Sequence, residues 1–339
     1  MKYNNIAVIY GSDSSEWEIS CRSGEFTASR IDDSKYSIYE IFARFGKWHL
    51  VSFRKKGAMR IKFPEEARPE INKNDFSVNI YGETIKFDFA FIMQHGTPGE
   101  NGLLQGYLEI IGIPFSSCSS FVSAVTFDKY SCKSYLRDVD YVNLAPDLLF
   151  RKGSGDLAEF CGKVTDSIGY PVFVKPTNGG SSFGVTKVHS EDKMVQAMSR
   201  AFTEGETVIV EKAIPGREFT CAAYRASDST VKALPVIEII TRNEYFDYDA
   251  KYNGSSEEVC PAEIDKALSA LIQETTCKIY GRLGCSGVVR VDYISGPDAL
   301  YFLEVNTIPG MTNASLVPKM VRAAGLDMTD FLTEIIESA

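Results

Sequence analysis

The sequence is poor in the residues that build zinc sites. It has three histidines, at positions 49, 95 and 189, and none of its eight cysteines forms a C-x-x-C pair. Structural zinc sites use closely spaced cysteines and histidines, so we expect none here. The apolar run at 6–10 is too short for the core of a signal peptide. Scattered cysteines without such a signal are typical of reduced thiols, so we expect a cytoplasmic protein.

The chain also lacks an excess of positive charge and any long apolar run. Its formal net charge is −9, which argues against nucleic acid as the main partner, because a phosphate backbone attracts lysine and arginine. No apolar stretch approaches the roughly 18–20 residues of a membrane span, so we expect no membrane partner. With 339 residues, the chain is long enough for two or three domains.

The first part of the chain alternates predicted strands and helices. Apolar runs predict strands at 6–12, 48–53 and 88–96, and helical spacing followed by a glycine predicts a helix at 36–46. This order predicts a parallel, doubly wound sheet, in which ligands bind beyond the carboxyl ends of the strands. Glu16 and His95 follow two such ends. We interpret the charged stretch 55–87 as an insertion or hairpin.

The rest of the chain predicts a mixed α+β unit. Its polar, aromatic-rich stretch 241–262 is long for a loop, and we interpret it as a lid. In chain order we expect a helix and a short strand at 102–117, a helix at 121–137, short strands through 141–240, a helix at 265–284, strands at 287–294 and 300–307, and a helical C-terminal segment.

Two short motifs place polar residues on strands. The outer residues of RVD (290–292) and of EVN (304–306) are two apart, so each pair faces one side of its strand. Paired as a hairpin, the strands would bring two acids and an amide together as ligands for Mg²⁺ bound with phosphates. A solvated sheet face with a salt bridge is the alternative. The buried face opposite would consist of Val289, Val291, Leu303 and Val305.

The segment GGSSFG (179–184) directly follows an apolar strand that contains Lys175. Glycine lets a backbone approach a ligand closely, and serine hydroxyls and N–H groups can contact oxygen atoms. A loop over phosphates and a simple hairpin turn both fit this segment. Two more strand-end residues, Glu211 and Lys212, suit the ribose and the phosphates of a nucleotide.

Taken in order, these motifs resemble the D-alanine–D-alanine ligases of the ATP-grasp superfamily. The resemblance covers nearly the whole chain except about residues 50–87. It is carried by GSDSSEWEIS (11–20), HGTPGENGLLQGYLEIIGIPF (95–115), FDKYSCK (127–133), VFVKPTNGGSSFGV (172–185), VIVEKAIPGREFT (208–220), FDYDAKY (246–252), GVVRVD (287–292) and LEVNTIPGMTNASLVP (303–318).

The resemblance implies a fold and an activity. The fold would be an N-terminal doubly wound parallel-sheet α/β domain (1–120), followed by a two-subdomain ATP-grasp fold. Its central subdomain (121–213) would carry the serine loop, and its C-terminal subdomain (214–339) the lid and a magnesium site. The activity would be ATP-dependent formation of D-alanyl-D-alanine through an acyl phosphate, for peptidoglycan synthesis. The resemblance also implies a cytoplasmic homodimer.

The resemblance further implies an ATP site between two sheets. Ser181 and Ser182 would belong to the loop over the phosphates, and Lys251 would reach the transferred phosphate from the lid. Two Mg²⁺ ions, with Mn²⁺ as a substitute, would be bound by Asp292, Glu304 and Asn306. The remaining ATP contacts would be Lys129, Phe173, Lys175, Glu211, Lys212, Ile214, Glu218 and Phe302.

The first D-alanine would bind through residues of the N-terminal domain. The resemblance places Glu16 on its ammonium and His95 near its carboxylate. Glu16, Ser181 and Tyr252 would form a hydrogen-bonded triad that links the first domain, the serine loop and the lid. The residues alone leave simpler alternatives open: a helix cap for Glu16, a structural turn for His95, and loop packing for Tyr252.

The second D-alanine would bind in the C-terminal subdomain. The resemblance assigns its carboxylate to Ser315 and Leu316 at a helix N-terminus, where a serine could also serve only as an N-cap. Arg290 and the N–H group of Gly310 would stabilise the oxyanion of the tetrahedral intermediate.

Three positions depart from the family pattern: YGSDSSE has one glycine, Asn101 replaces an aspartate, and a glycine precedes the serines of the glycine loop where Glu-Gly is common. These departures affect substrate positioning more than the class of reaction.

Tyr252 favours an amine over D-lactate as the second substrate. The alternatives are another ATP-grasp carboxylate–amine ligase, a D-alanine–D-lactate ligase, or a non-catalytic ATP-binding regulator, which is disfavoured because Arg290 and the predicted metal ligands are present.

Overall fold

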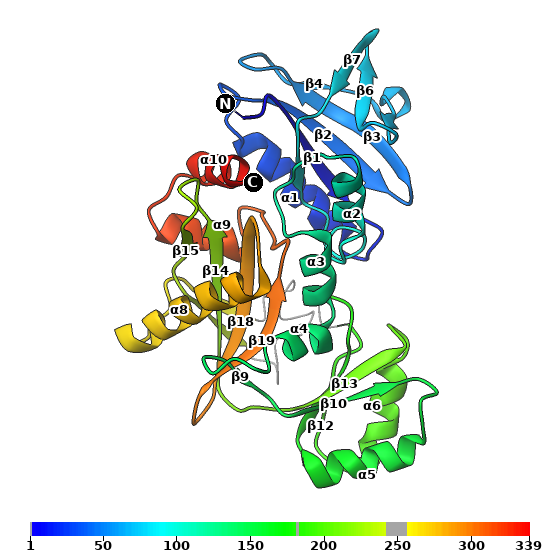
Figure 1. Ribbon diagram of the computed structural model, residues 1–339, viewed down its shortest axis with the longest axis vertical. Helices are drawn as coiled ribbons and strands as arrows, with labels where there is room; N and C mark the ends of the chain where they lie inside the picture. Colours follow the sequence, from blue (N-terminus) through cyan, green and yellow to red (C-terminus); the bar gives the residue numbers. More distant parts are fainter. Residues whose placement is uncertain (1, 181–182, 242–255) are drawn as a thin grey trace.

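The computed structural model describes residues 2–180, 183–241 and 256–339. A five-stranded sheet lies at one end of the molecule, a seven-stranded sheet in the middle, and a four-stranded sheet at the other end (Figure 1). Both α/β and α+β units are therefore present. Within the described ranges, no helix combines the length and the apolarity that crossing a bilayer would need.

The five-stranded sheet has a parallel centre and antiparallel additions. Its order is β4-β3-β2-β1-β8, with β1 parallel to both β2 and β8, and with β3 and β4 antiparallel to their neighbours. The elements of this unit are β1 (Asn5–Gly11), α1 (Trp17–Arg30), β2 (Ser37–Arg44), β3 (Lys47–Arg54), β4 (Ile61–Lys62), β8 (Phe89–Ile92) and α2 (Leu103–Ile110).

The helix predicted at 36–46 is wrong, because this segment forms β2. The strand lies between β1 and β3, and Ile38, Tyr39, Glu40 and Ile41 are all buried. A strand that is covered on both faces shows no period-two alternation, so its apolar residues also fit helical spacing. Its isoleucines and aromatic residues are typical of strands.

The stretch 55–87 contains a hairpin, as predicted. β6 and β7 pair antiparallel, and β5 adds a third strand to this small sheet. Aromatic residues pack it against the first sheet, as Phe76, just before β6, does by contacting Trp48 of β3. The elements are η1 (Glu65–Ala67), β5 (Ile71–Asn72), β6 (Ser77–Ile80) and β7 (Glu83–Lys86).

The helix predicted at 121–137 is divided at Asp128 into α3 (Ser120–Phe127) and α4 (Lys129–Tyr135). Asp128 has extended backbone angles, and its carboxylate accepts a hydrogen bond of 2.7 Å from the N–H group of Ser131. It therefore caps α4, and Lys129 is the first residue of this second helix.

The four-stranded sheet, of order β10-β13-β11-β12, is covered on one face only. Val172, Val174, Val208 and Val210 pack there with α5 and α6, two helices that the sequence interpretation missed. Because side chains alternate along a strand, Phe173, Lys175 and Glu211 point to the other face and line a cavity. The elements are β10 (Asp147–Arg151), α5 (Leu157–Ser167), β11 (Val172–Pro176), β12 (Thr186–Val188), η2 (Glu191–Lys193), α6 (Met194–Ala201) and β13 (Thr207–Lys212).

The seven-stranded sheet has the order β17-β16-β14-β18-β19-β9, with β15 paired to β14. Helix α8 confirms the helix predicted at 265–284, and its Ile272 and Ile279 share a core with Val289 and Val291 of β18. The elements are β9 (Asn143–Leu144), β14 (Arg217–Arg225), β15 (Val231–Ala233), β16 (Ile237–Thr241), β17 (Ser256–Val259), α8 (Lys266–Leu283), β18 (Val288–Ser295) and β19 (Leu300–Asn306).

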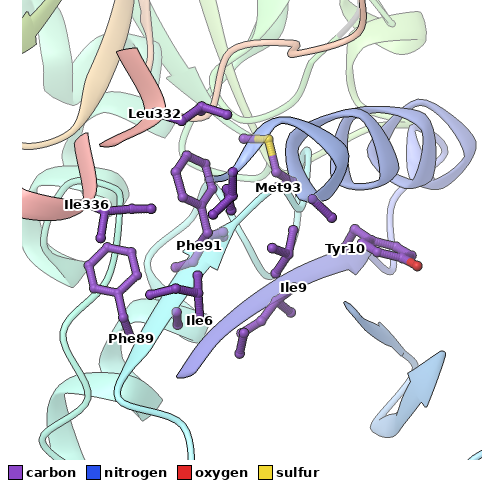
Figure 2. Close-up of a cluster of buried hydrophobic side chains, with 14 of the residues drawn as sticks. Ile6, Ile9, Tyr10, Phe89, Phe91, Met93, Leu332 and Ile336 are labelled. Atoms are coloured by element: carbon purple, nitrogen blue, oxygen red, sulfur yellow. The ribbon is translucent and has the colours of Figure 1, made fainter. Parts of the chain in front are cut away.

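The last two helices, α9 (Leu316–Ala323) and α10 (Met328–Ser338), return to the N-terminal sheet. Leu332 and Ile336 of α10 lie beside Phe91 and Phe89 of β8 in one buried cluster (Figure 2). The N-terminal sheet and the C-terminal helices therefore share a hydrophobic core, which fixes the first sheet against the end of the chain.

We expect Gly24→Ala in α1 to destabilise the protein by about 1–3 kcal/mol, the usual cost of overpacking a core. A Cβ at this position would lie 2.2 Å from Cδ1 of Tyr10 on β1, so helix and strand must move apart. Gly162→Ala in α5 is the matched control, because nothing lies within 4 Å of its added Cβ and alanine favours a helix. Urea unfolding measures both free energies, and a Gly24→Ala variant as stable as the parent would contradict this packing.

Candidate active site

Two cavities meet between the sheets. The larger one, about 830 Å³, lies between the four-stranded and the seven-stranded sheets. The smaller one, about 350 Å³, lies where the segments after β1 and β8 face β18 and β19. Lys129, Gly179, Gly180 and Glu304 line both cavities. A group bound at this junction is within reach of ligands in either cavity, which is what transfer between two substrates requires.

The predicted ATP contacts gather in the larger cavity. Phe173 forms part of its wall, with the ammonium groups of Lys175 and Lys187 at 5.3 and 5.9 Å from the ring centroid. Ser181, Ser182 and Lys251 lie outside the described residues. The predicted contacts that line this cavity are Lys129, Phe173, Lys175, Glu211, Lys212, Ile214, Glu218 and Phe302.

The two strand-end lysines of this cavity lie near opposite ends of β11, because Lys175 belongs to β11 itself and Lys212, on β13, pairs with Val172 at its start. Lys175 lies near the end of the strand, before the glycine loop, with its Nζ 2.7 Å from Oε2 of Glu211. Lys212 donates to the carbonyl groups of Gly169 and Tyr170, which precede β11, at 3.2 and 2.9 Å. Of these two lysines, Lys175 is therefore the one placed beside the glycine loop.

The hairpin of β18 and β19 forms as predicted. Arg290 lies opposite Asn306, and Asp292 lies opposite Glu304. The guanidinium of Arg290 donates to both carboxylate oxygens of Asp292, at 2.9 and 2.8 Å, and Thr220 donates to one of them at 2.6 Å. All four polar residues predicted for this face are therefore brought together.

One detail of this hairpin differs from the prediction. A bulge between Asp292 and Tyr293 shifts the register, so Leu303 lines the larger cavity instead of joining the buried face. Phe302 faces the core and is 2% exposed, although it also forms part of the cavity wall.

Asp292, Glu304 and Asn306 fit a Mg²⁺ site by the chemistry of their donors. Carboxylate and amide oxygens are hard ligands, and Mg²⁺ in nucleotide sites takes few protein ligands and completes its shell with phosphate oxygens and water. In the described part of the chain, no three acidic, histidine or cysteine side chains form a preformed metal cluster. Glu304 lies 3.3 Å from Nζ of Lys129, so its charge is balanced by a cation in this structure.

Glu16 lies between the N-terminal unit and the glycine loop. It occupies the N-cap position of α1, but its side chain makes no capping hydrogen bond. A Cβ added to Gly180 would lie 2.7 Å from Oε2 of Glu16, so the glycine loop and this carboxylate approach each other closely. The helix-cap alternative is therefore not supported. Ser181 and Tyr252, the other members of the predicted triad, lie outside the described residues.

His95 is buried in the wall of the smaller cavity, and both of its ring nitrogens have partners. Nδ1 lies 2.9 Å from the carbonyl oxygen of Ile308, and Nε2 lies 3.0 Å from Oγ of Ser23. Because a carbonyl only accepts, Nδ1 carries the proton and Ser23 donates to Nε2. Burial lowers the pKa of His95 against the opposing effect of Glu16, so the ring is neutral. His95 thus ties the segment after β8 to the segment after β19.

The N-terminus of α9 forms another part of the smaller cavity. Ser315 is the N-cap residue, but its hydroxyl lies 2.7 Å from Oγ1 of Thr312 and makes no capping bond to the helix. Gly310, Ser315 and Leu316 all line the cavity. A helix N-terminus without a side-chain cap favours an anion, so this end of the cavity suits a carboxylate.

Glu100 is a site residue that the sequence interpretation missed. Its Oε2 accepts a hydrogen bond of 2.7 Å from the N–H group of Gly96. With the amide oxygen of Asn306 turned to Arg290, the amide nitrogen donates to Oε1 of Glu100 at 3.1 Å. Burial, followed by the charge of Glu16, raises the pKa of Glu100 to about 8. The available signal was the motif HGTPGENG, of which only His95 and Asn101 were interpreted.

The departure at Asn101 falls in the loop that carries Glu100. Its amide donates to Oγ1 of Thr97 at 2.9 Å, and its side-chain oxygen accepts from the N–H group of Leu103 at 3.3 Å. Asn101 therefore stabilises the turn that leads into α2.

Comparisons with known proteins agree with this geometry. The families described as "D-ala D-ala ligase N-terminus" and "D-ala D-ala ligase C-terminus" match residues 5–118 and 137–337. The D-alanine--D-alanine ligases of Parabacteroides distasonis and Phocaeicola vulgatus are 46% and 43% identical over 98% of the chain, and cover 96% and 98% of their own lengths.

Solved structures give the same result. The VanG D-Ala:D-Ser ligase from Enterococcus faecalis has a TM-score of 0.85 at 31% identity, with 99% of each chain covered. The D-alanyl-alanine synthetase A from Vibrio cholerae has a TM-score of 0.84 at 26% identity, covering 99% of this chain and 98% of its own.

We expect Glu100→Gln to stabilise the ligand-free protein at alkaline pH. Folding raises the pKa of Glu100 from 4.5 to about 8, so the folded state holds a proton that the unfolded chain releases. The resulting stabilisation is complete below the unfolded pKa and is lost as the pH rises through the folded pKa. Glutamine keeps the shape of the side chain and has no such proton to lose.

Urea unfolding at about pH 5 and about pH 9 tests this expectation. The variant should gain stability relative to the parent at the higher pH. Glu18→Gln, on the exposed side of α1, is the control and should change stability alike at both. A difference between parent and Glu100→Gln that is the same at both pH values would contradict the raised pKa.

Proposed function

The chain belongs to the D-alanine–D-alanine ligase family, and we propose that it joins two D-alanines where its two cavities meet. It is an ATP-dependent ligase with an ATP-grasp fold, and its product, D-alanyl-D-alanine, serves peptidoglycan synthesis. The observation that carries the placement of the reaction is the shared lining of the cavities by Lys129, Gly179, Gly180 and Glu304. ATP in one cavity and D-alanine in the other would meet there.

ATP lies in the larger cavity in this proposal. Lys129 and Lys175 bind its phosphate oxygens, and Phe173, Ile214 and Phe302 supply apolar walls for the base. Lys212 and Glu218 complete the site, together with Ser181, Ser182 and Lys251, which remain predictions outside the described residues. Asp292, Glu304 and Asn306 would hold two Mg²⁺ ions, or Mn²⁺, and the metal would neutralise charge on the β- and γ-phosphates.

The first step forms an acyl phosphate. Glu16 holds the ammonium of the first D-alanine in the smaller cavity, and His95 fixes the segments on either side of it. A carboxylate oxygen of this D-alanine attacks the γ-phosphorus, and the bond from that phosphorus to the β-phosphate oxygen breaks. The products are ADP and D-alanyl phosphate. Water must stay out, because an acyl phosphate hydrolyses.

The second step forms the peptide bond. The helix N-terminus at Ser315 and Leu316 binds the carboxylate of the second D-alanine, whose amine has lost a proton. This amine attacks the acyl carbon, and the bond from that carbon to the phosphate oxygen then breaks, so that inorganic phosphate leaves with the proton that the attacking nitrogen loses. Arg290 and the N–H group of Gly310 donate to the oxyanion of the tetrahedral intermediate.

The setting of this reaction is also part of the proposal. We place the enzyme in the cytoplasm as a homodimer, with small-molecule substrates and without nucleic acid or membrane partners. The division into 1–120, 121–213 and 214–339 is supported by the sheets, each of which is built mainly from one segment, although β9 of the central segment joins the seven-stranded sheet.

The identity of the second substrate defines the main alternative. One structural neighbour is a D-Ala:D-Ser ligase, whereas the relatives from Phocaeicola vulgatus and Parabacteroides distasonis are D-alanine--D-alanine ligases. Phosphate release measured with D-alanine alone, and with D-alanine plus D-serine, D-lactate or L-alanine, separates these candidates. We expect the highest rate with D-alanine alone. No release with any D-amino acid would overturn the ligase assignment.

We expect Glu304→Gln to abolish nearly all turnover, because it removes one of two carboxylates available to a divalent ion at the junction. Asp298→Asn is the matched control, since Asp298 lies at the exposed turn of the same hairpin and bonds to Tyr301. Phosphate release is measured across a Mg²⁺ titration. Normal turnover of Glu304→Gln at low Mg²⁺ would show that Glu304 does not bind the metal.

A further inference from the structure

Lys133 is a buried cation to which the mechanism above gives no role. Its side chain is 1% exposed, and it belongs to α4. Its ammonium lies 2.5 Å from Oε1 of Glu211, 2.8 Å from Oδ2 of Asp147 and 2.9 Å from the carbonyl oxygen of Ala145. Burying a lysine is costly unless it is paired, so this side chain is held where both carboxylates compensate its charge.

Glu211 connects this buried lysine to the larger cavity. Its Oε1 faces Lys133, and its Oε2 lies 2.7 Å from the ammonium of Lys175. Burial opposes the ionised form of Glu211, but Lys175 and Lys133 outweigh it and lower the pKa to about 2. One carboxylate thus forms ion pairs with two ammonium groups, that of Lys133 from α4 and that of Lys175 from β11.

The register of the four-stranded sheet explains this placement. Glu211 on β13 lies directly opposite Asp147 on β10 and Phe173 on β11, so the three side chains share the face that borders the cavity. Lys175 follows Phe173 by two residues and shares that face. The valines between them occupy the opposite face, against α5 and α6.

Helix α4 provides the other half of the arrangement. Lys129 and Lys133 are four residues apart, so they lie on one side of the helix. Lys129 reaches the junction of the cavities, where its ammonium donates to the carbonyl oxygen of Gly179 at 3.0 Å. The backbone is tied to the same sheet, because the N–H group of Lys129 donates to the carbonyl oxygen of Thr177 at 2.8 Å.

We propose that Lys133 and Glu211 act as positioning residues that set the ammonium of Lys175 relative to that of Lys129, so that Glu211 acts through Lys175 and not as the direct ATP contact that the family resemblance implies. The bridge runs from α4 through Lys133 and Glu211 to Lys175 on β11. It therefore links the two lysines that would face the phosphates, because Lys129 belongs to α4. This inference rests on the proposed function, which places the phosphates of ATP between these two lysines.

Removal of Lys133 leaves the charge of Glu211 less well compensated than the charge of Asp147. Asp147 keeps Arg137, whose Nη2 lies 2.7 Å from its Oδ1. Glu211 keeps only Lys175 of its two ammonium partners. Its Oε1 then has no cation beside it and faces the negative charge of Asp147, which lies opposite on β10. The carboxylate should turn, and the ammonium of Lys175 should move with it.

The test compares Lys133→Met with Asp147→Asn. Both variants break the buried contact between Lys133 and Asp147, so both should lower the urea midpoint. Lys133→Met should also raise the KM for ATP about tenfold or more, the effect of losing one well-placed charge-assisted hydrogen bond. The KM for D-alanine should stay near that of the parent. Asp147→Asn should leave both KM values near those of the parent.

Glu211→Gln keeps the test decisive if Lys133→Met fails to fold. This variant should raise the KM for ATP by a similar factor. Where Lys133→Met does fold, the KM for ATP of the double variant should be no higher than that of the more affected single variant, because both substitutions act on one bridge. If Lys133→Met or, in its place, Glu211→Gln loses stability without a change in the KM for ATP, the two residues are only structural and the inference is wrong.

Binding of a fluorescent ATP analogue separates this inference from the proposed function. The analogue should bind the parent whichever amino acid is the substrate, and it should bind Lys133→Met and Glu211→Gln about tenfold more weakly. A parent that binds the analogue without ligating D-alanine would contradict the proposed function alone. Equal binding by the parent and the variants would contradict the positioning role.

Discussion

The cleft depends on the compensation of opposite charges at buried and partly buried positions. Lys129 lies beside Glu304, Lys175 beside Glu211, and Arg290 beside Asp292. A buried charge without a partner is strongly destabilising, so these pairs allow the protein to fold around a site that must bind anionic phosphates and a divalent cation. In the proposed mechanism, a phosphate that binds Lys129 would release Glu304 for a cation, and the reverse would also hold. Binding would then exchange partners within a site whose total charge changes little.

A second constraint is the shared core that holds the two halves of the smaller cavity together. Helix α10 packs on β8 in the same buried cluster as β1 (Figure 2). Near this core, Ser23 on α1 lies within hydrogen-bond distance of His95 and of the N–H group of Met311. His95 in turn bonds to Ile308. Segments 213 and 288 residues apart in the sequence are therefore fixed against each other before any substrate binds.

Features with a local pattern could be predicted from the sequence. The β18–β19 hairpin is such a case, because side chains alternate along a strand and both motifs carry polar residues two apart. The segment at 36–46 was misjudged because its partners on both faces are distant in sequence and leave no alternation. Lys133 and Glu100 were missed for a related reason: each acquires its role from a residue far along the chain, Glu211 and Asn306 respectively. No spacing within either motif reports such a contact.

The loop that carries Glu100 shows how backbone conformation places a carboxylate at such a site. Gly96 has a positive φ of 70°, and a Cβ on Gly99 would lie 2.1 Å from the carbonyl oxygen of Gln94. The chain therefore folds back on itself in a way that a side chain at either position would oppose. In this turn the N–H group of Glu100 donates to the carbonyl oxygen of Gly96 at 2.7 Å, while its carboxylate accepts from the N–H group of Gly96. Both bonds are made within the loop that contains Glu100, and they fix its side chain. Its other carboxylate oxygen, Oε1, is therefore already oriented toward the amide of Asn306. Gly96 and Gly99 of HGTPGENG thus allow the turn that orients Glu100 toward Asn306 on β19.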